Sequence, residues 1–441
     1  MVFSSLLFLF RFLPITFLIY YLVPFKAKNT VLFLASLFFY TWGETKFFPI
    51  MLISIGINYV AGLMIERYDH NEKARKACFW VAFLVTLGFL LFFKYTNFFL
   101  SNINALLGLS LPLLDSAEFH LPLGISFYTF QILAYTMDVY RRKIKVEHNL
   151  IDFGAFVVLF PQLIAGPIVL YSDISRELKS RKITLAQIDE GVGLFIMGLA
   201  SKILLADTIG ALWTEVQTLG FSQVSTPLAW MGIIAYSFQI YFDFSGYSLM
   251  AIGLGRMLGF FFPQNFNYPY ISKSITEFWR RWHITLSSWF RDYVYIPLGG
   301  NRVKKSRQFF NIFVVWFLTG FWHGAAWNFI FWGLYFFVLL MIEKSFLLKY
   351  LEKSKVLSHV YLIFFIIISW GIFALSDLSQ MGALFNRMFS LHGGTDWMYY
   401  LRDYAAMFVL CILASTPFFK KLADSAAGKN RVVRTVFLAG V

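Results

Sequence analysis

The chain is poor in charged residues and in cysteine. Asp, Glu, Lys and Arg make up 14% of its 441 residues, whereas a soluble domain contains about 25%. The two cysteines, Cys78 and Cys411, lie in or beside apolar segments and indicate neither a disulfide framework nor a metal site. The short alternating segments of an outer-membrane barrel are also missing. These absences exclude a soluble enzyme, a disulfide-rich secreted domain and a membrane barrel.

Apolar residues are abundant instead: 59% are hydrophobic and 20% aromatic. Long apolar runs recur along the whole sequence, which predicts an all-α polytopic membrane protein. At roughly 20 residues per crossing, we expect about ten to twelve membrane segments in a single membrane-embedded domain over residues 1–441. Residues 3–23 should form the first membrane helix and not a cleavable signal, because the run is long and contains Arg11. Runs 32–42 and 47–64 should form a hairpin.

The net charge of +14 lies mostly in short loops between apolar runs. This is the pattern of the positive-inside rule, so the partner that it predicts is the lipid bilayer and not nucleic acid. If all these loops face the cytoplasm, the N-terminus lies outside. The basic loops are residues 26–28, 66–76, 141–145, 176–182, 273–307, 344–355 and 420–434.

Two segments are predicted to be broken. Residues 153–170 contain Pro161 and Pro167, which argue against a straight helix. Such a segment is tolerated in a membrane only where protein or a cavity surrounds it, so we expect a re-entrant or broken helix. Residues 228–262 should cross with a break near Ser245-Gly246.

One histidine lies deep in an apolar stretch. Residues 309–341 contain no Asp, Glu, Lys or Arg, and His323 is near their midpoint. An ionisable group at such depth is costly, so it usually faces the bundle interior or a water-filled cavity and has a function there. Small residues around it, Gly320, Gly324, Ala325 and Ala326, would permit close helix packing or leave room for a ligand. The alternative is a histidine held by structural hydrogen bonds.

A second histidine lies in the longest basic loop. If residues 275–293 form one helix, the three-and-four spacing predicts an aromatic face and a basic face. Such a helix is typical of the membrane interface, which explains the arginines but not a histidine on the aromatic face. The aromatic face would hold Trp279, Trp282, His283, Leu286 and Phe290, and the other face Arg280, Ser287 and Arg291.

Several blocks together resemble the membrane-bound O-acyltransferase family, in its alginate O-acetyltransferase branch. They extend along most of the chain in the expected order, which is far more specific than one short motif. The blocks are Asn-Phe-Asn-Tyr-Pro-Tyr-Ile-Ser at 265–272, Glu-Phe-Trp-Arg-Arg-Trp-His at 277–283, Arg-Asp-Tyr-Val-Tyr-Ile-Pro-Leu-Gly-Gly-Asn-Arg at 291–302, Trp322-His323-Gly324, Pro-Leu-Gly-Ile-Ser-Phe-Tyr at 122–128 and Phe-Pro-Gln-Leu-Ile-Ala-Gly-Pro at 160–167.

The resemblance implies an inner-membrane enzyme with a tunnel across the bilayer. Acetyl-CoA would enter from the cytoplasm, and the acetyl group would reach an extracytoplasmic polysaccharide such as alginate, with a periplasmic or membrane-anchored acetyltransferase as partner. His323 would be the catalytic residue and His283 the second polar position of the site. Asp243, Gln239 and Trp322 are candidates for the tunnel lining, although Asp243 and Gln239 could equally be structural. Lys202 and Asp207 are expected near segment ends.

The chemistry agrees with these assignments. Acyl transfer from a thioester to a hydroxyl needs a base, and a neutral imidazole suits that task. His283 would orient His323 or position the thioester, and a covalent acyl-enzyme remains an alternative. Arg280, Arg281 and Arg291 would bind the phosphates of acetyl-CoA, unless they are only positive-inside charges.

Two other functions remain open at this level. Within the family, the alternative is D-alanyl transfer to teichoic acid from a carrier-protein thioester, although the run 296–302 favours the polysaccharide branch. That branch often has a Tyr-His-Gly after the Trp-His-Gly block, whereas here Tyr335 is followed by Phe336 and Phe337. Outside the family, broken helices and buried polar groups also suit a non-enzymatic transporter.

Overall fold

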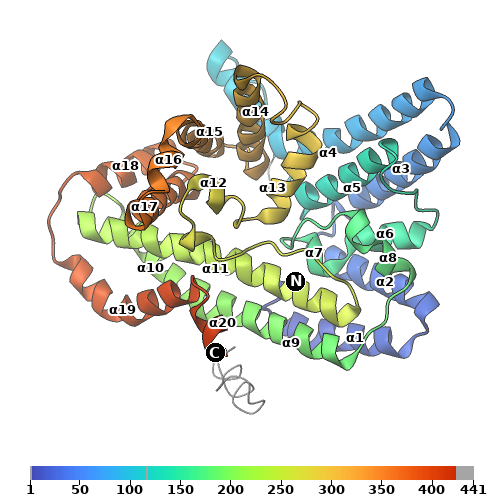
Figure 1. Cartoon of the computed structure of the whole chain (residues 1–441), viewed down its shortest axis with the longest axis horizontal. Coiled ribbons are helices and arrows are strands. Elements are labelled where there is room, and N and C mark those ends of the chain that lie inside the picture. Colours follow the sequence, from blue (N-terminus) through green and yellow to red (C-terminus); the bar gives the residue numbers. More distant parts are fainter. Residues whose placement is uncertain (1, 116–117, 424–441) are drawn as a thin grey trace. The chain divides into compact units, whose positions relative to one another are not determined.

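The computed structural model describes residues 2–115 and 118–423, and every regular element in these ranges is a helix. The predicted all-α class is therefore confirmed. The chain forms two compact units, one from residues 1–192 with 251–263 and the other from residues 193–250 with 264 onward (Figure 1). Part of the predicted basic loop 420–434 lies outside the described residues.

Among the described residues, six helices are long and apolar enough to cross a membrane. They support a multi-pass membrane protein. Lys202 and Asp207 lie inside the helix Leu185–Leu219, which at 35 residues is longer than one crossing, so their predicted position near the ends of a membrane segment stays a prediction. The six are Phe48–Arg67, Glu72–Leu107, Leu185–Leu219, Trp327–Leu351, Lys355–Ala374 and Asp396–Ala414.

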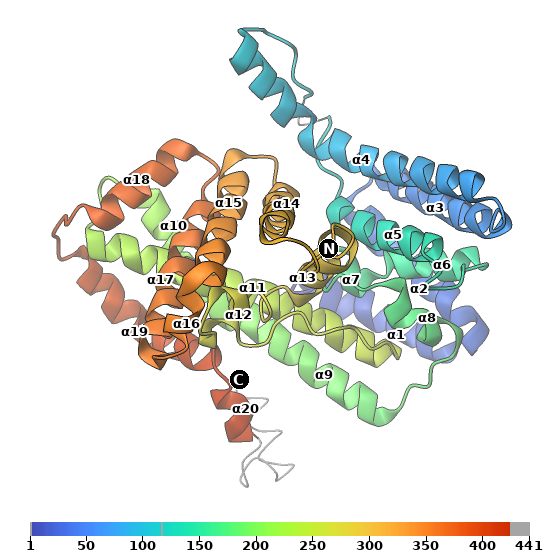
Figure 2. The same cartoon turned by 45° about the horizontal axis from the view of Figure 1, so that its top comes forward.

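Of the predicted hairpin, the structure confirms the two helices and the turn but not their packing. Helix α2 (Phe25–Gly43) is followed after a short turn by α3 (Phe48–Arg67), and α2 packs mainly against α6 (Leu150–Val158). Helices α3, α4 (Glu72–Leu107) and α5 (Ile125–Tyr140) run side by side (Figures 1 and 2). Local signals set the ends of α4: the Asn71 side chain accepts a hydrogen bond from the Ala74 amide, and the helix stops at Gly108.

The predicted break in residues 153–170 is confirmed. Helix α6 (Leu150–Val158) ends, α7 (Phe160–Leu163) follows with Pro161 in its first turn, and the chain then runs without regular structure to Leu170. Gly124, whose φ is +69°, allows the backbone before α5 to lie close to the backbone of α7. A Cβ on it would lie 2.7 Å from the Leu163 carbonyl oxygen.

The basic loops of the first unit meet one another through ion pairs and hydrogen bonds. Arg142 Nε lies 2.9 Å from Asp69 Oδ1, which joins loops 141–145 and 66–76. Arg181 Nη1 donates to Asn29 Oδ1 at 2.7 Å and so joins loop 176–182 to the start of α2. Each contact joins one pair of basic loops, as the positive-inside rule expects of loops that share a membrane face.

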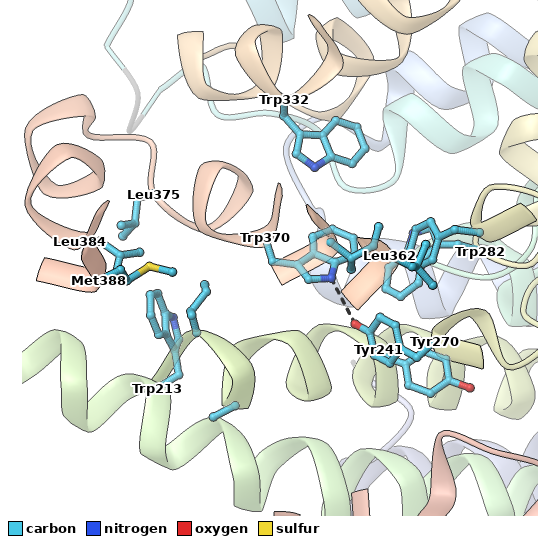
Figure 3. Close-up of a cluster of buried hydrophobic side chains, with 14 of the residues drawn as sticks. Trp213, Tyr241, Tyr270, Trp282, Trp332, Leu362, Trp370, Leu375, Leu384 and Met388 are labelled. Atoms are coloured by element: carbon cyan, nitrogen blue, oxygen red, sulfur yellow. Dashed lines mark hydrogen bonds between the residues drawn. The ribbon is translucent and has the colours of Figure 1, made fainter. Parts of the chain in front are cut away.

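The core of the second unit is rich in tryptophan (Figure 3). Trp332 of α15 (Trp327–Ile342) and Trp370 of α17 (Lys355–Ala374) are fully buried in it. Trp370 Nε1 donates to the Tyr270 hydroxyl at 3.1 Å, so a buried polar atom is paired within the aromatic cluster. In a bilayer, close packing of such large side chains replaces hydrophobic burial as the main source of helix association.

The predicted break near Ser245-Gly246 is wrong. Helix α11 runs without interruption over Thr226–Leu258. Gly246 serves close helix packing instead: a Cβ on it would lie 2.7 Å from the Gly198 carbonyl oxygen of α9 (Leu185–Ala200). The small residues mark a helix crossing.

The predicted single helix over 275–293 is also wrong. The segment forms α12 (Ile275–Phe278), a turn, and α13 (Ile284–Phe290). His283 ends the turn with φ +44°, a left-handed conformation that no continuous helix contains. The aromatic spacing therefore reflects two short helices packed into one core and not one interfacial helix.

A carboxylate from a distant helix caps α12. Glu343 is buried, and its Oε1 accepts from the Ile275 amide at 2.6 Å while Oε2 accepts from the Thr276 amide at 2.9 Å. In Glu343→Ala, the buried Ile275 amide and the part-buried Thr276 amide lose their acceptor, so we expect a loss of on the order of 3 kcal/mol in unfolding free energy. Thermal unfolding in nanodiscs measures the loss. The exposed Glu352→Ala should change stability little, and equal effects of the two variants would contradict the capping role.

Candidate active site

His323 lies at the end of α14 (Lys305–His323), where the chain turns into α15. Its half-buried imidazole is surrounded by aromatic rings. The ring centroids of Trp332 and Phe373 lie 5.0 and 5.3 Å away, both edge-on to the imidazole. The predicted hairpin with His323 near its midpoint is therefore confirmed.

Glycines make this turn possible. A Cβ on Gly320 would lie 2.3 Å from the Phe329 carbonyl oxygen, and one on Gly333 would lie 2.4 Å from the Trp316 carbonyl oxygen. The backbones of α14 and α15 therefore touch at the level of the histidine, as small residues permit in membrane helices. This close crossing fixes where the His323 imidazole stands.

His283 is buried beside α11 and the loop that follows it. Its imidazole packs edge-on against Phe244, with ring centroids 4.7 Å apart. Its Nδ1 lies 3.1 Å from Asn265 Oδ1. The left-handed backbone at His283 directs the chain from the turn into α13, and the side chain remains in the core with an exposed fraction of 1%.

Trp322 links the two histidines. Its ring centroid lies 5.0 Å from that of His323 and 6.1 Å from that of His283. The structure thus brings both predicted catalytic histidines and one predicted tunnel residue into a single aromatic cluster. Residues 283 and 323 come from separate segments, so the fold and not the local sequence assembles this group.

Burial lowers the pKa of His283 to about 3. Among the described residues no charged group adds to this shift, because only removal of the ring from solvent contributes. His283 is consequently neutral at physiological pH. A neutral imidazole offers one N–H donor and one acceptor nitrogen.

This buried neutral histidine predicts a pH-dependent stability. In the unfolded chain His283 takes up a proton near its ordinary pKa of 6.5, whereas in the folded chain it does so only near 3. The unfolded state binds more protons between these values, so stability falls as the pH drops below about 6.5. We expect the unfolding temperature to fall more steeply with acidification for wild type than for His283→Gln. Parallel curves would contradict a neutral His283.

The predicted phosphate-binding arginines differ in their surroundings. Arg281 pairs with Glu277 at 2.9 Å, and Arg291 pairs with Asp292 at 2.7 Å. Arg280 is exposed. To bind a phosphate, Arg281 and Arg291 would have to give up their carboxylate partners, whereas the Arg280 side chain is exposed to solvent.

The two polar tunnel candidates on α11 have partners other than the histidines. Asp243 pairs at 2.7 Å with Lys202, which also pairs with Asp207 at 2.6 Å. Gln239 packs over Gly210 and lines a cavity of about 530 Å³ together with residues of α10 (Thr208–Leu219). Of the three predicted tunnel residues, Trp322 lies beside the histidines.

The sequence-based prediction missed Asn265, whose Oδ1 lies 3.1 Å from His283 Nδ1, and Ser248 and Thr285, which hydrogen-bond to the Asn265 side chain. The sequence did contain a signal for Asn265, because this residue begins the block at 265–272 that resembles the membrane-bound O-acyltransferase family. Over residues 2–115 and 118–423 no group of three His, Cys, Asp or Glu side chains is placed to hold a metal ion.

Comparison with known proteins identifies the family of the chain. The family model described as MBOAT, membrane-bound O-acyltransferase family, matches residues 34–382. A probable alginate O-acetylase AlgI of Azotobacter vinelandii is 40% identical over 399 residues, 90% of this chain and 79% of the relative. A peptidoglycan O-acetyltransferase of Helicobacter pylori is 36% identical over 435 residues, 89% of this chain and 80% of the relative.

A more distant relative acts on a different polymer. A teichoic acid D-alanyltransferase of Streptococcus thermophilus is 32% identical over 240 residues, 52% of this chain and 58% of the relative. The match to the family model covers most of the chain, including both histidines. The chain belongs to the membrane-bound O-acyltransferase family and is an O-acyltransferase.

Proposed function

We propose that this enzyme moves acetyl groups from cytoplasmic acetyl-CoA across the bacterial inner membrane for O-acetylation of an extracytoplasmic polysaccharide. The observation that carries the proposal is the pair of imidazoles joined by Trp322 in an aromatic core. Similarity to the alginate O-acetylase favours alginate or a similar polymer, and similarity to the peptidoglycan O-acetyltransferase makes a cell-wall glycan the second possible acceptor.

His323 is the proposed general base. Its neutral imidazole takes the proton of the attacking hydroxyl while the oxygen bonds to the thioester carbonyl carbon. The C–S bond then breaks, and the thiolate of CoA leaves and regains a proton. His283, whose pKa is about 3, is too weak a base for this step, so its role is to position a reacting group.

The site would serve a tunnel that joins the two membrane faces. Shorter and broken helices such as α6 and α7 would complete the ten to twelve crossings beyond the six long apolar ones. Arg280, Arg281 and Arg291 would hold the phosphates of acetyl-CoA at the cytoplasmic mouth. A periplasmic or membrane-anchored acetyltransferase would receive the acetyl group and complete its transfer.

The choice of acyl donor tests the proposal. Purified enzyme in nanodiscs is given acetyl-CoA in one reaction and a D-alanyl-loaded carrier protein in another, and release of the free thiol is measured. We expect thiol release from acetyl-CoA. Release from the carrier protein alone would replace the proposal by D-alanyl transfer, and no release from either donor by folded enzyme would contradict both.

A further inference from the structure

The side-chain amide of Asn265 is held in one orientation by its neighbours. The backbone N–H of Thr285 donates to Oδ1 at 3.3 Å, and the Thr285 hydroxyl donates to the same oxygen at 2.9 Å. On the other side, Nδ2 donates to the Ser248 hydroxyl at 3.0 Å. A backbone N–H can only donate, so the atom that it contacts must be the amide oxygen.

This orientation determines which ring nitrogen of His283 carries the hydrogen. Because Asn265 Oδ1 can only accept, the His283 Nδ1 that lies 3.1 Å from it must carry the proton. In a neutral imidazole the other nitrogen, Nε2, then has a lone pair and no hydrogen. Nε2 is itself buried and has no hydrogen-bond partner among the described residues.

We propose that Asn265 is a positioning residue that holds His283 as the Nδ1–H tautomer, so that His283 Nε2 accepts a hydrogen bond from a group that arrives with the substrates. The inference rests on the proposed acetyl transfer for its catalytic meaning. The tautomer itself follows from the hydrogen bonds alone.

The backbone reinforces the pairing of the two residues. The Ile284 amide donates to the Asn265 carbonyl at 2.9 Å, and the Asn267 amide donates to the Arg281 carbonyl at 2.9 Å. Segment 265–267 therefore lies alongside the turn that carries His283. Asn265 has an exposed fraction of 0% and His283 one of 1%, so water cannot replace either partner.

The tautomer limits the role that the Nε2 atom of His283 can have. A nitrogen with a lone pair cannot donate to the thioester carbonyl oxygen, so His283 does not stabilise the oxyanion from Nε2. It accepts from a hydroxyl or N–H instead. Since its pKa is about 3, it accepts the hydrogen bond without taking the proton, and His323 remains the base.

The substitution Asn265→Asp should change the pKa of His283, which a loss of packing alone would not do. Among the described residues, the side chains that contact His283 through a hydrogen bond or ring packing are Phe244 of α11, Asn265 and Trp322 of α14, and all three are uncharged. A carboxylate beside Nδ1–H favours the imidazolium and raises the histidine pKa by roughly one to three pH units. The protonated ring then loses its acceptor at Nε2.

We expect Asn265→Asp to raise the pKa of His283 by about one to three pH units, measured as the pH at which its nitrogen-15 NMR signals change on titration of the folded enzyme. Asn267→Asp is the matched control: the same change two residues away, on an exposed side chain, which should leave the pKa of His283 unchanged. A wild-type His283 pKa in folded Asn265→Asp would overturn the positioning role.

Nitrogen-15 NMR of histidine-labelled wild-type enzyme in nanodiscs tests the tautomer without any turnover. The His283 signals are assigned by their loss in His283→Gln. We expect a protonated Nδ1 and an unprotonated Nε2 at pH 7, whereas an Nε2–H tautomer or an imidazolium would overturn the inference. If the expected tautomer is found in an enzyme that does not consume acetyl-CoA, the proposed function fails and the assignment of Asn265 stands.

Discussion

Replacement of His323 by alanine is expected to lower acetyl-CoA turnover by about 10²–10⁴-fold, the usual contribution of a general base. The reason is that the variant leaves the attacking hydroxyl with no group to take its proton. Fold and substrate affinity should change little, because the half-buried imidazole lies at a helix end and its removal does not disturb the α14–α15 crossing. The loss should therefore appear in kcat, measured as CoA release by enzyme in nanodiscs.

The matched control for this prediction is His392→Ala. The His392 side chain is exposed and lies in the turn between α18 (Leu378–Phe389) and α19 (Asp396–Ala414). Its removal should leave turnover unchanged. If His323→Ala keeps wild-type turnover, or loses activity only in proportion to a lower unfolding temperature, His323 is structural and the assigned mechanism is wrong.

Gly320→Ala is expected to destabilise the enzyme by about 1–3 kcal/mol or more and to abolish most of its activity. The new methyl group would lie 2.3 Å from the Phe329 carbonyl oxygen. That oxygen belongs to the backbone, so no change of rotamer can relieve the contact. Helices α14 and α15 must move apart, and His323, three residues further along, moves with them.

Gly56→Ala provides the comparison for this change. A Cβ on Gly56, inside α3, meets nothing within 4 Å. The same substitution there should leave stability unchanged or raise it by about 0.4–1 kcal/mol, since alanine restricts the unfolded chain. Thermal unfolding of both variants in nanodiscs gives the measurement. Similar unfolding temperatures for Gly320→Ala and wild type would show that the crossing is looser than described.

Features fixed by local chemistry could be predicted from the sequence. The low charge and recurring apolar runs gave the all-helical membrane class. The break after α6 followed from Pro161, whose ring prevents a continuous helix. His323 stood out because a titratable side chain at that depth is costly.

Features that depend on packing were misjudged. Ser245-Gly246 suggested a break in α11, yet the glycine permits contact with Gly198 in an unbroken helix. The helical spacing of aromatics over 275–293 also misled, because residues of two short helices in one core can follow the same spacing. A local signal was overlooked there, since Ser274 caps α12 by accepting from the Glu277 amide at 3.0 Å.

Long-range partners could not be inferred from one sequence. Asn265 and His283 are 18 residues apart, and Glu343 reaches Ile275 across 68 residues. The sequence around Asn265 or Glu343 gives no indication of which distant residue each one contacts. These contacts hold the site in place, and only the folded chain shows them.

The central claim, that cytoplasmic acetyl-CoA reacts at His323, is tested most directly by sided turnover in proteoliposomes. The orientation of the enzyme is established by protease cleavage in the exposed end of the loop 273–307, residues 301–307, and acetyl-CoA is then supplied to intact enzyme on one side only. CoA release should occur when acetyl-CoA is on the side where this loop is cleaved, and it should be lost in folded His323→Ala. Release from the opposite side alone, or release that persists without His323, would contradict the account.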